Sequence, residues 1–233
     1  RLKQALKKTD ENSYIRGWHE NGVRDRLEAF IERGLPEYFK QLESHDDKAI
    51  IHADFSKHFP LSPPEPKRLF LSMFSISTQQ LLFDISSGRI TGLIDYDFSC
   101  VLHPSHEFLC SFSGFGGKFG GWPGIEAREE RALKEAKLHG FPDPLPDDQQ
   151  DGEGVQWKVA KAWEDALQNE GCRRPMTISG IDIVANVDAL LSSILPWRVT
   201  NSDILRRQTD QAIQNCRNEN EKVLIEILEH IGF

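Results

Sequence analysis

The sequence predicts an α+β fold that is mainly α. Apolar residues recur at helical spacing towards both ends of the chain, and short apolar runs separated by turn residues lie between them, at 49–95. The 233 residues, of which 39% are hydrophobic and 27% charged, are enough for one globular domain with a substantial core or for two small domains. No internal repeat interrupts this pattern.

The N-terminal part of the chain is predicted to be helical. The apolar residues between Val23 and Ile31 recur at the spacing of one helix face, and Gly34 stands where such a helix would end. Pro36 suits the first turn of another helix, whose apolar face would carry Phe39. Two consecutive helices are therefore expected before residue 45.

Three short strands are predicted in the middle of the chain. The run 49–52 is typical of a buried strand that leads into a loop, and 81–85 and 89–95 are two further strand candidates. The residues between the last two are Ser-Ser-Gly, which is turn chemistry. These two strands are therefore expected to pair as a hairpin.

The chain is predicted to be helical again from about residue 105 onwards. Gly140, Gly171 and Pro196 each follow an apolar-periodic segment and mark its end. A segment rich in proline and aspartate, 141–154, separates the first two helices and is expected to be a solvent-exposed loop. The predicted helices are 126–139, 155–169, 181–195, 202–216 and 219–231.

Composition excludes several classes of function. The formal net charge of −8 and the pI of about 5.5 provide no basic footprint for nucleic acid. No apolar run reaches the length of a membrane span. The four cysteines lie far apart, with neither a CxxC metal pattern nor a dense disulfide framework, which favours a reducing, cytoplasmic setting.

Two short acidic motifs carry the chemistry. His52-Ala53-Asp54 ends the first predicted strand, and Ile94-Asp95-Tyr96-Asp97 ends the predicted hairpin. Transfer of a phosphoryl group from a nucleotide needs a carboxylate that orients or accepts the proton of the attacking hydroxyl, and oxygen ligands for Mg²⁺. A loop aspartate followed by an aspartate after a hairpin supplies both. A His-x-Asp triplet also occurs in metal-dependent hydrolases. A hydrolase that uses His52, Asp54 and Asp95 is therefore an alternative class of function.

The stretches IIHADFSKH, LLFDISSGRITGLIDYDFS and HPSHEFL together resemble the catalytic region of the aminoglycoside phosphotransferase and choline kinase family. The resemblance covers about residues 49–109. It implies that 1–233 is a protein-kinase-like C-terminal lobe with a small β-hairpin at the catalytic loop, followed by a helical substrate-side subdomain at 110–233. The implied activity is transfer of the γ-phosphate of ATP, with Mg²⁺, to a hydroxyl of a small molecule.

The resemblance assigns a role to each motif residue. Asp54 corresponds to the catalytic base, and His52 to the residue that braces its loop. Asp95 corresponds to the Mg²⁺ ligand, with Asp97 assisting at the metal or through a neighbouring group. Lys57 is close enough in sequence to meet a phosphate of ATP.

The sequence departs from the family pattern at the metal site. The family places an asparagine five residues after the catalytic aspartate, where this chain has Phe59. An atypical segment, 59–80, carries four prolines and separates the two motifs. If that segment is set aside, the residue before the hairpin is Gln80, which is the remaining candidate for the third metal ligand.

A second departure concerns the nucleotide side of the site. About fifty residues precede His52, and they are predicted to be helical rather than to form the phosphate-covering loop and lysine of an N-terminal lobe. The glycine-rich stretch 114–121 lacks P-loop spacing, so it is expected to be a flexible loop near the mouth of the site. Glu107 follows Pro104 where the family often has an acidic residue, and the resemblance implies that it holds the catalytic loop.

Two interpretations remain open. In the first, the intact protein is an active phosphotransferase with a small-molecule acceptor. This chain would then derive from a gene model that lacks an upstream exon and includes 59–80 as translated non-coding sequence. Alternatively, the chain is a catalytically inactive pseudokinase, or a fragment, that acts as a binding module. In either case, the face left bare by the missing lobe is expected to expose apolar surface and to favour self-association.

Overall fold

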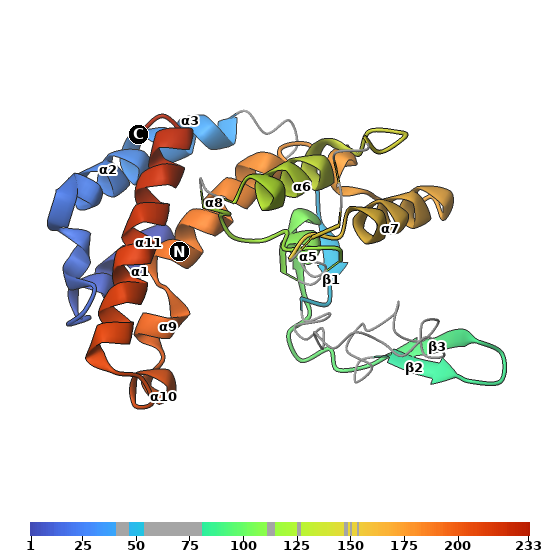
Figure 1. The fold of residues 1–233 in the computed structure, drawn as a ribbon, viewed down its shortest axis with the longest axis horizontal. Coiled ribbons are helices and arrows are strands. Elements are labelled where there is room, and N and C mark those ends of the chain that lie inside the picture. Colours follow the sequence, from blue (N-terminus) through green and yellow to red (C-terminus); the bar gives the residue numbers. More distant parts are fainter. Residues whose placement is uncertain are drawn as a thin grey trace. The chain divides into compact units, whose positions relative to one another are not determined.

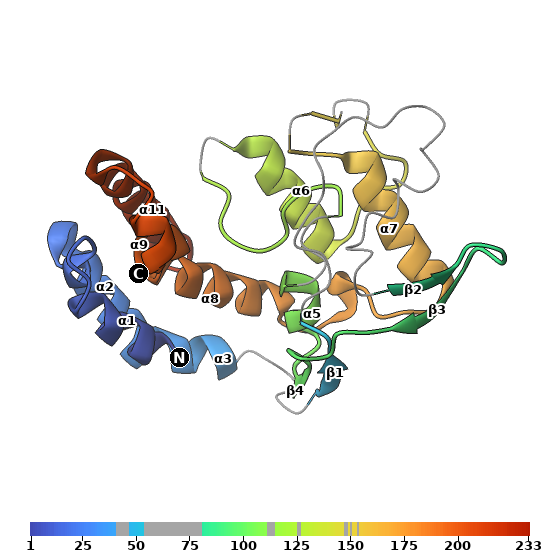
Figure 2. The same ribbon diagram turned by 90° about the horizontal axis from the view of Figure 1, so that it is seen from below.

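A computed structural model describes residues 1–40, 47–53, 81–110, 115–124, 127–146, 149, 151–152 and 154–233. The chain forms two compact units (Figures 1 and 2). The first unit combines Arg1–Glu43, Gly120–Ala132 and Ser179–Phe233, and the second combines Ser44–Phe119 and Leu133–Ile178. The fold is α+β and mainly helical, which confirms the predicted class.

The first unit is entirely helical in its described residues. Helix α11 packs against α8 and α2, and α1 packs against α8, so segments from both ends of the chain share one core. Its elements are α1 (Leu2–Asp10), the short turns η1 (Arg16–Trp18) and η2 (Glu20–Gly22), α2 (Val23–Ala29), the π-turn η3 (Phe30–Gly34), α3 (Leu35–Lys40), α8 (Ile181–Ile194), α9 (Trp197–Thr200), α10 (Ser202–Leu205) and α11 (Asp210–His230).

The core of the first unit confirms the predicted N-terminal helix face. Val23, Leu27 and Phe30 are fully buried, and they pack with apolar residues of α8 and α11. Trp18 joins this core and donates its indole N–H to the carbonyl of Ile194 at 3.0 Å. Burial of these large side chains is the main source of stability for the unit, at about 1.5–3 kcal/mol for each.

Gly34 does not end the N-terminal helix as predicted. The chain passes through the π-turn η3 directly into α3. A Cβ at position 34 would lie 2.3 Å from the ring of Phe233 and 2.7 Å from that of Phe30. Glycine is therefore required here because two aromatic rings approach the backbone, which the local sequence pattern does not reveal.

The predicted helices 202–216 and 219–231 are also corrected. The structure has the short helix α10, then a break, and then the single long helix α11. Asn201 caps α10 with its side chain, and Thr209 caps α11 by accepting a hydrogen bond from Ala212 N at 3.3 Å. The break therefore falls at a capping threonine, whereas 216–219 contains neither glycine nor proline and stays helical.

The second unit contains all the strands of the described chain. Strands β1 (Ala49–Ile51) and β4 (Cys100–Leu102) form one antiparallel ribbon, and β2 (Leu81–Asp84) and β3 (Arg89–Leu93) form another, which confirms the predicted hairpin. Strand β4 was not predicted. The helical elements are α5 (Ser105–Cys110), α7 (Trp157–Asn169), η4 (Pro175–Thr177) and most of α6 (Arg128–His139), whose first residues belong to the first unit.

The turn of the hairpin is held by one carboxylate. Asp84 accepts hydrogen bonds from the hydroxyl of Ser87 at 2.6 Å and from the hydroxyl and backbone N–H of Ser86 at 2.7 and 2.9 Å. These bonds, led by that from Ser87, lower the pKa of Asp84 to about 2. The Ser-Ser-Gly turn therefore works as predicted, with Gly88 in the left-handed region that glycine favours.

The glycine-rich stretch is packed rather than open in its described part. Phe115 and Phe119 are both buried, and Phe115 stacks on Trp163 at a centroid distance of 5.5 Å. A Cβ at Gly116 would lie 2.5 Å from the carbonyl oxygen of Gln156, so this segment lies close against α7. Among the described helices, none combines the length and apolar character that a membrane span requires.

Candidate functional site

The two acidic motifs meet at the end of the β1–β4 ribbon. His52 follows β1 directly, is buried, and its Nε2 lies 2.9 Å from the carbonyl oxygen of Ile94. Its ring also lies against that of Tyr96, with 5.0 Å between the centroids. A hydrogen bond and a ring contact therefore join the first motif to the segment that contains Asp95, although 42 residues separate His52 from Ile94.

The backbone is strained on both sides of this junction. Ala53 and Asp95 have φ angles of +64° and +67°, in the left-handed region that residues other than glycine seldom adopt. Such a conformation costs about 1–2 kcal/mol for an ordinary residue. Strain of this kind persists only where surrounding contacts hold it, and it is frequent at functional sites. Here it falls on the residue before Asp54 and on Asp95 itself.

Glu107 supplies the contact that holds the first motif. It lies in the first turn of α5, and its Oε2 accepts a hydrogen bond from the backbone N–H of His52 at 2.5 Å and another from that of Ala53 at 3.4 Å. Its other oxygen, Oε1, is buried and has no hydrogen-bond partner among the residues that the structure describes. The carboxylate thus fixes the peptide that turns the chain towards Asp54.

Asp95 and Asp97 lie on an open turn. The carbonyl of Tyr96 accepts hydrogen bonds from the backbone N–H of Ser99 at 2.9 Å and from its hydroxyl at 2.7 Å, which closes the turn. Both aspartates are exposed, so their carboxylates are open to solvent and to a ligand.

The donor set suits Mg²⁺ held together with phosphates. Mg²⁺ commonly takes one or two carboxylates and completes its shell with water and phosphate oxygens, and Asp95 supplies one accessible carboxylate. No cluster of three or more His, Cys, Asp or Glu side chains that could hold a metal is present within the described residues.

Several predicted site residues lie outside the described part of the chain. These are Asp54, Lys57 and Gln80, together with the atypical segment 59–80. Their predicted roles therefore remain predictions. Of the predicted site residues that are described, the structure brings His52 next to the segment of Asp95.

Residue types gave no signal for two features of the site. The first is the aromatic contact of Tyr96 with His52. The second is the left-handed backbone at Ala53, because alanine has no preference for that region. The order of the two motifs in the sequence indicated that they form one site. The sequence did not predict the pairing of β4 with β1, which brings the two motifs close together.

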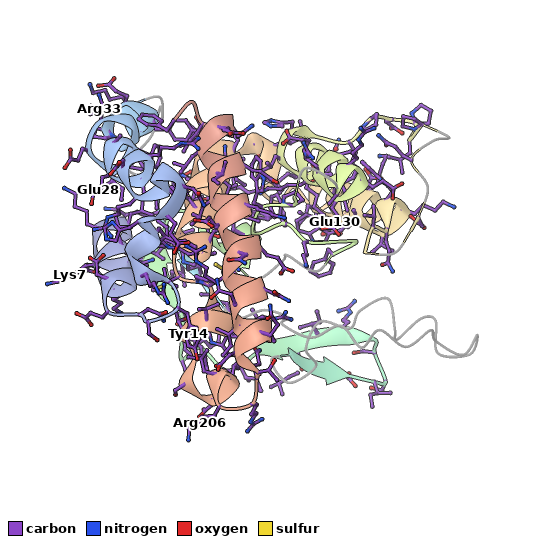
Figure 3. All side chains as sticks on the ribbon, turned by 60° about the vertical axis from the view of Figure 1, so that its left-hand side comes forward. Lys7, Tyr14, Glu28, Arg33, Glu130 and Arg206 are labelled. Atoms are coloured by element: carbon purple, nitrogen blue, oxygen red, sulfur yellow. The ribbon has the colours of Figure 1, made fainter. Side chains whose placement is uncertain are left out.

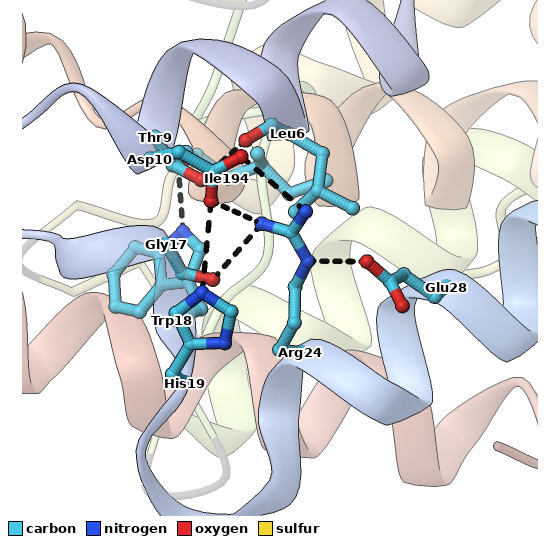
Figure 4. Close-up of polar contacts among 9 residues, drawn as sticks. All are labelled: Leu6, Thr9, Asp10, Gly17, Trp18, His19, Arg24, Glu28 and Ile194. Atoms are coloured by element: carbon cyan, nitrogen blue, oxygen red, sulfur yellow. Dashed lines mark hydrogen bonds and ion pairs between the residues drawn. The ribbon is translucent and has the colours of Figure 1, made fainter.

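A concavity lies in the first unit. It is a depression of about 470 Å³ at the end of α1, lined by Asp10, Glu11, Asn12, Ser13, Arg16 and His19. Beside it, Arg24 donates to Asp10 at 2.7 Å, to the carbonyl of Gly17 at 3.2 Å and to Glu28 at 2.6 Å (Figure 4). These bonds satisfy the carboxylate of Asp10 within the fold, so they serve to hold the loop.

The same loop is pinned at several other points. The side-chain oxygen of Asn12 accepts hydrogen bonds from the backbone N–H groups of Tyr14 and Ile15 at 3.0 and 2.9 Å, and its amide donates to the carbonyl of Val199 at 3.0 Å. Tyr14, labelled in Figure 3, also hydrogen-bonds Asp210 at 3.2 Å. The loop also holds Arg16 and Trp18 at φ angles of +51° and +58°, and these contacts assign that left-handed backbone to the fold of the loop.

Comparison with known proteins found no matching family model, no similar curated protein and no similar solved structure.

Proposed function

We propose that the second unit carries the catalytic and metal-binding side of an ATP-dependent phosphotransferase that acts on a hydroxyl of a small molecule. The observation that supports this most directly is the 2.9 Å contact between His52 Nε2 and the carbonyl of Ile94, which brings the end of the first motif to the start of the second. The resemblance of these motifs to the aminoglycoside phosphotransferase and choline kinase family supplies the reaction class.

In this proposal Asp54 orients the acceptor hydroxyl and takes its proton. The hydroxyl oxygen forms a bond to the γ-phosphorus as the bond to the bridging oxygen of ATP breaks, and ADP leaves. Asp95 holds Mg²⁺ against the phosphates, with Asp97 and Gln80 as further oxygen donors. When bound, the metal neutralises negative charge on the phosphates. Lys57 contacts a phosphate.

Two residues have a positioning role rather than a catalytic one. His52 bridges to Ile94, and Glu107 accepts hydrogen bonds from the N–H groups of His52 and Ala53. Together they fix the peptide before Asp54 relative to the backbone at Asp95. Such fixation matters because catalysis of phosphoryl transfer depends mainly on positioning and on stabilisation of charge.

The setting is proposed from the same chemistry. ATP is available in the cytoplasm, and free cysteines, of which this chain has four, are usual in that reducing compartment. The acidic net charge of the chain gives no support for nucleic-acid partners. The acceptor is a small molecule, and the helices of 110–233 are the proposed source of its contacts.

A second function is a binding module without catalysis. The described residues 1–40 form only helices and turns, so that part of the chain offers no strand to carry a phosphate-covering loop. Phe59 also stands where the family has its metal-binding asparagine. In this second proposal the chain binds a ligand at Asp95 but transfers no phosphate.

Titration calorimetry with ATP in the presence and absence of Mg²⁺ tests the metal site. Asp95→Asn is expected to weaken Mg²⁺-dependent ATP binding about tenfold or more, because it removes a charged oxygen ligand. Asp143→Asn is the matched control: it also removes an exposed carboxylate from the second unit, but one distant in sequence from both motifs. Equal binding by wild type and Asp95→Asn would contradict the proposed metal site.

Turnover separates the two proposed functions. Release of ADP from Mg²⁺-ATP by this chain, abolished in Asp54→Asn, would establish the phosphotransferase and exclude the inactive module. Mg²⁺-ATP binding without turnover would establish the module. Absence of both binding and turnover would contradict the phosphotransferase, and it would also exclude a module that binds nucleotide.

A further inference from the structure

Two adjacent arginines precede an exposed threonine in the loop between α10 and α11. The sequence from 206 to 209 is Arg-Arg-Gln-Thr, and this loop lies at one end of the first unit (Figure 1). Arg207 and Thr209 are exposed, and so is 74% of the side chain of Arg206, which is labelled in Figure 3. In a chain with a net charge of −8, this is a short basic segment beside an accessible hydroxyl group.

The spacing suits a serine/threonine protein kinase that selects basic sequences. Charge patterns around the acceptor decide which substrates a protein kinase takes, and a kinase of this class binds arginines two and three residues before the acceptor in acidic pockets. Arg207 and Arg206 occupy these two positions relative to Thr209. Among the serines and threonines that the structure describes, Thr209 alone follows two arginines at this spacing.

Two other threonines near basic residues are less accessible to a kinase. Thr9 follows two lysines but is fully buried. The hydroxyl of Thr177 donates to the carbonyl of Arg174 at 2.8 Å and accepts a hydrogen bond from the N–H of the same residue at 3.1 Å, so it is held inside the η4 turn. The hydroxyl oxygen of Thr209 instead accepts a hydrogen bond from Ala212 N at 3.3 Å, at an exposed position.

The backbone around Thr209 can enter the active site of a kinase at little cost. A kinase binds the residues before the acceptor in an extended conformation, and Thr209 is already extended, with φ −77° and ψ 153°. The preceding helix α10 has only four residues, none of which is buried. So short a helix has little stability of its own, so its opening presents the two arginines to a kinase and leaves the long helix α11 in place.

We propose that Thr209 is a phosphorylation site for a serine/threonine protein kinase that selects basic sequences. In the transfer, Oγ1 of Thr209 forms a bond to the γ-phosphorus of ATP as the bond from that phosphorus to the bridging oxygen breaks. ADP leaves, and the hydroxyl proton passes to the catalytic carboxylate of the kinase. Thr209 belongs to the first unit, so this modification is independent of the phosphotransferase proposed for the second unit.

A phosphate at this position is expected to strengthen the start of α11. Thr209 is the N-terminal cap of the helix, and a phosphate there adds a charge of about −1.5 to −2 at the positive end of the helix dipole. Phosphate oxygens are also stronger acceptors than a hydroxyl for the N–H groups of the first turn. Arg206 and Arg207 are near enough in sequence to pair with the phosphate, which offsets the repulsion from Asp210.

Incubation of the full chain with ATP, Mg²⁺ and the purified catalytic subunit of cyclic-AMP-dependent protein kinase tests the site. The expected result is incorporation of phosphate that peptide mapping assigns to Thr209. Thr209→Ala and Thr209→Asn should both abolish it, and because asparagine is a good helix cap, the loss in Thr209→Asn does not come from loss of the cap. Thr200→Ala is the matched control: Thr200 is an exposed threonine of the same unit with a single arginine in the three positions before it, and its loss should leave the incorporation at Thr209 unchanged.

Substitution of an arginine tests recognition by charge. Arg207→Gln is expected to lower kcat/KM for phosphorylation of Thr209 about tenfold or more, because it removes a cation that the acidic pockets of the kinase bind. Arg198→Gln is the matched control, since it removes an exposed arginine from α9 of the same unit. It should change kcat/KM less than about twofold.

Hydrogen exchange of the phosphorylated chain measures the effect on α11. The amide of Ile213, which donates to the carbonyl of Thr209 at 3.1 Å, is expected to exchange about two- to fivefold more slowly after phosphorylation, because the helix dipole favours the added charge. Faster exchange of this amide would overturn the proposed strengthening of α11.

Three results would each overturn the phosphorylation site. They are absence of phosphate at Thr209, equal kcat/KM for Arg207→Gln and the wild type, and the same incorporation when the kinase is left out. The last result would assign the transfer to the chain itself rather than to a kinase that selects basic sequences.

Discussion

Lys137 is buried in the second unit, where a charged side chain is costly. Its ammonium donates to the carbonyl of Gly117 at 2.6 Å and lies 5.8 Å from the centroid of the Phe119 ring. Burial lowers the pKa of Lys137 to about 7, because removal from water disfavours the charged form. The glycine-rich segment therefore packs around a lysine that is readily neutralised.

This lysine predicts a pH dependence of stability. Its pKa is lower in the folded chain than the value of 10.5 expected when unfolded, so the cost of its burial is complete below about pH 7 and falls as the pH rises towards 10.5. Lys137→Met should stabilise the second unit by about 1–3 kcal/mol at pH 6, and by less at pH 9. Urea unfolding at several pH values, followed by hydrogen exchange of α6 and α7, measures this.

Lys158→Met is the control, since it removes an exposed lysine from α7 of the same unit. It should leave the free energy of unfolding unchanged within about 0.5 kcal/mol. If the two variants showed the same pH dependence, the lowered pKa of Lys137 would be excluded as its cause.

Residue types alone indicated part of the candidate site. The acidic motifs predicted Asp54 and Asp95 as site residues, because their order and spacing resemble those of a known family of phosphotransferases. The left-handed backbone at Ala53 and the ring of Tyr96 against His52 had no such signal. Both depend on which strands pair, and that pairing is decided by contacts between segments far apart in the sequence.

At the scale of elements, α11 is organised around a buried ion pair. Arg217 is 3% exposed and donates to both carboxylate oxygens of Glu221, at 2.7 and 3.3 Å. It also lies 3.0 Å from Glu20 and stacks on the ring of Trp18 at 5.2 Å. The arginine therefore links α11 to the loop after α1.

Loss of this arginine should be strongly destabilising. Arg217→Met keeps much of the volume but leaves the carboxylate of Glu221 buried without its partner, which should lower the free energy of unfolding by about 3–5 kcal/mol. Chemical denaturation measures the change. Adding Glu221→Gln to Arg217→Met should recover part of the loss, since the buried charge is then absent.

Arg206→Met is the matched control for this ion pair. Arg206 pairs with Asp203 on the surface, where both side chains are more than 70% exposed. An exposed pair contributes about 0–1 kcal/mol. Equal losses of unfolding free energy in Arg206→Met and Arg217→Met would show that burial of the Arg217–Glu221 pair has no energetic consequence.

The elements that sequence periodicity predicted well are those whose ends carry local signals. Gly140 and Pro196 mark the ends of α6 and α8 closely, and the Ser-Ser-Gly turn marks the hairpin. The continuous helix α11 was missed because its start depends on capping by Thr209, a residue that also fits mid-helix. Strand β4 was missed because three residues carry too little periodicity to detect.

At the scale of the molecule, the two units are expected to respond separately to core substitutions. Leu224 is fully buried in the core of the first unit. Leu224→Ala should destabilise that unit by about 2–5 kcal/mol. Hydrogen exchange followed by mass spectrometry should show faster exchange in α2, α8 and α11, and unchanged exchange in α7.

Leu133→Ala is the reciprocal variant in the core of the second unit. It should accelerate exchange in α7 and leave the amides of α11 unchanged. Uniform acceleration over the whole chain by either variant would mean that the units unfold as one cooperative body.

By itself, the sequence determined the mainly helical α+β class, the hairpin and the acidic motifs, because periodicity, turn residues and motif spacing are local properties. Tertiary structure alone decided that Gly34 makes room for two aromatic rings, that Lys137 is buried, and that His52 lies beside Ile94. Each of these depends on contacts between distant segments, and such contacts are fixed by how the cores pack rather than by any local pattern.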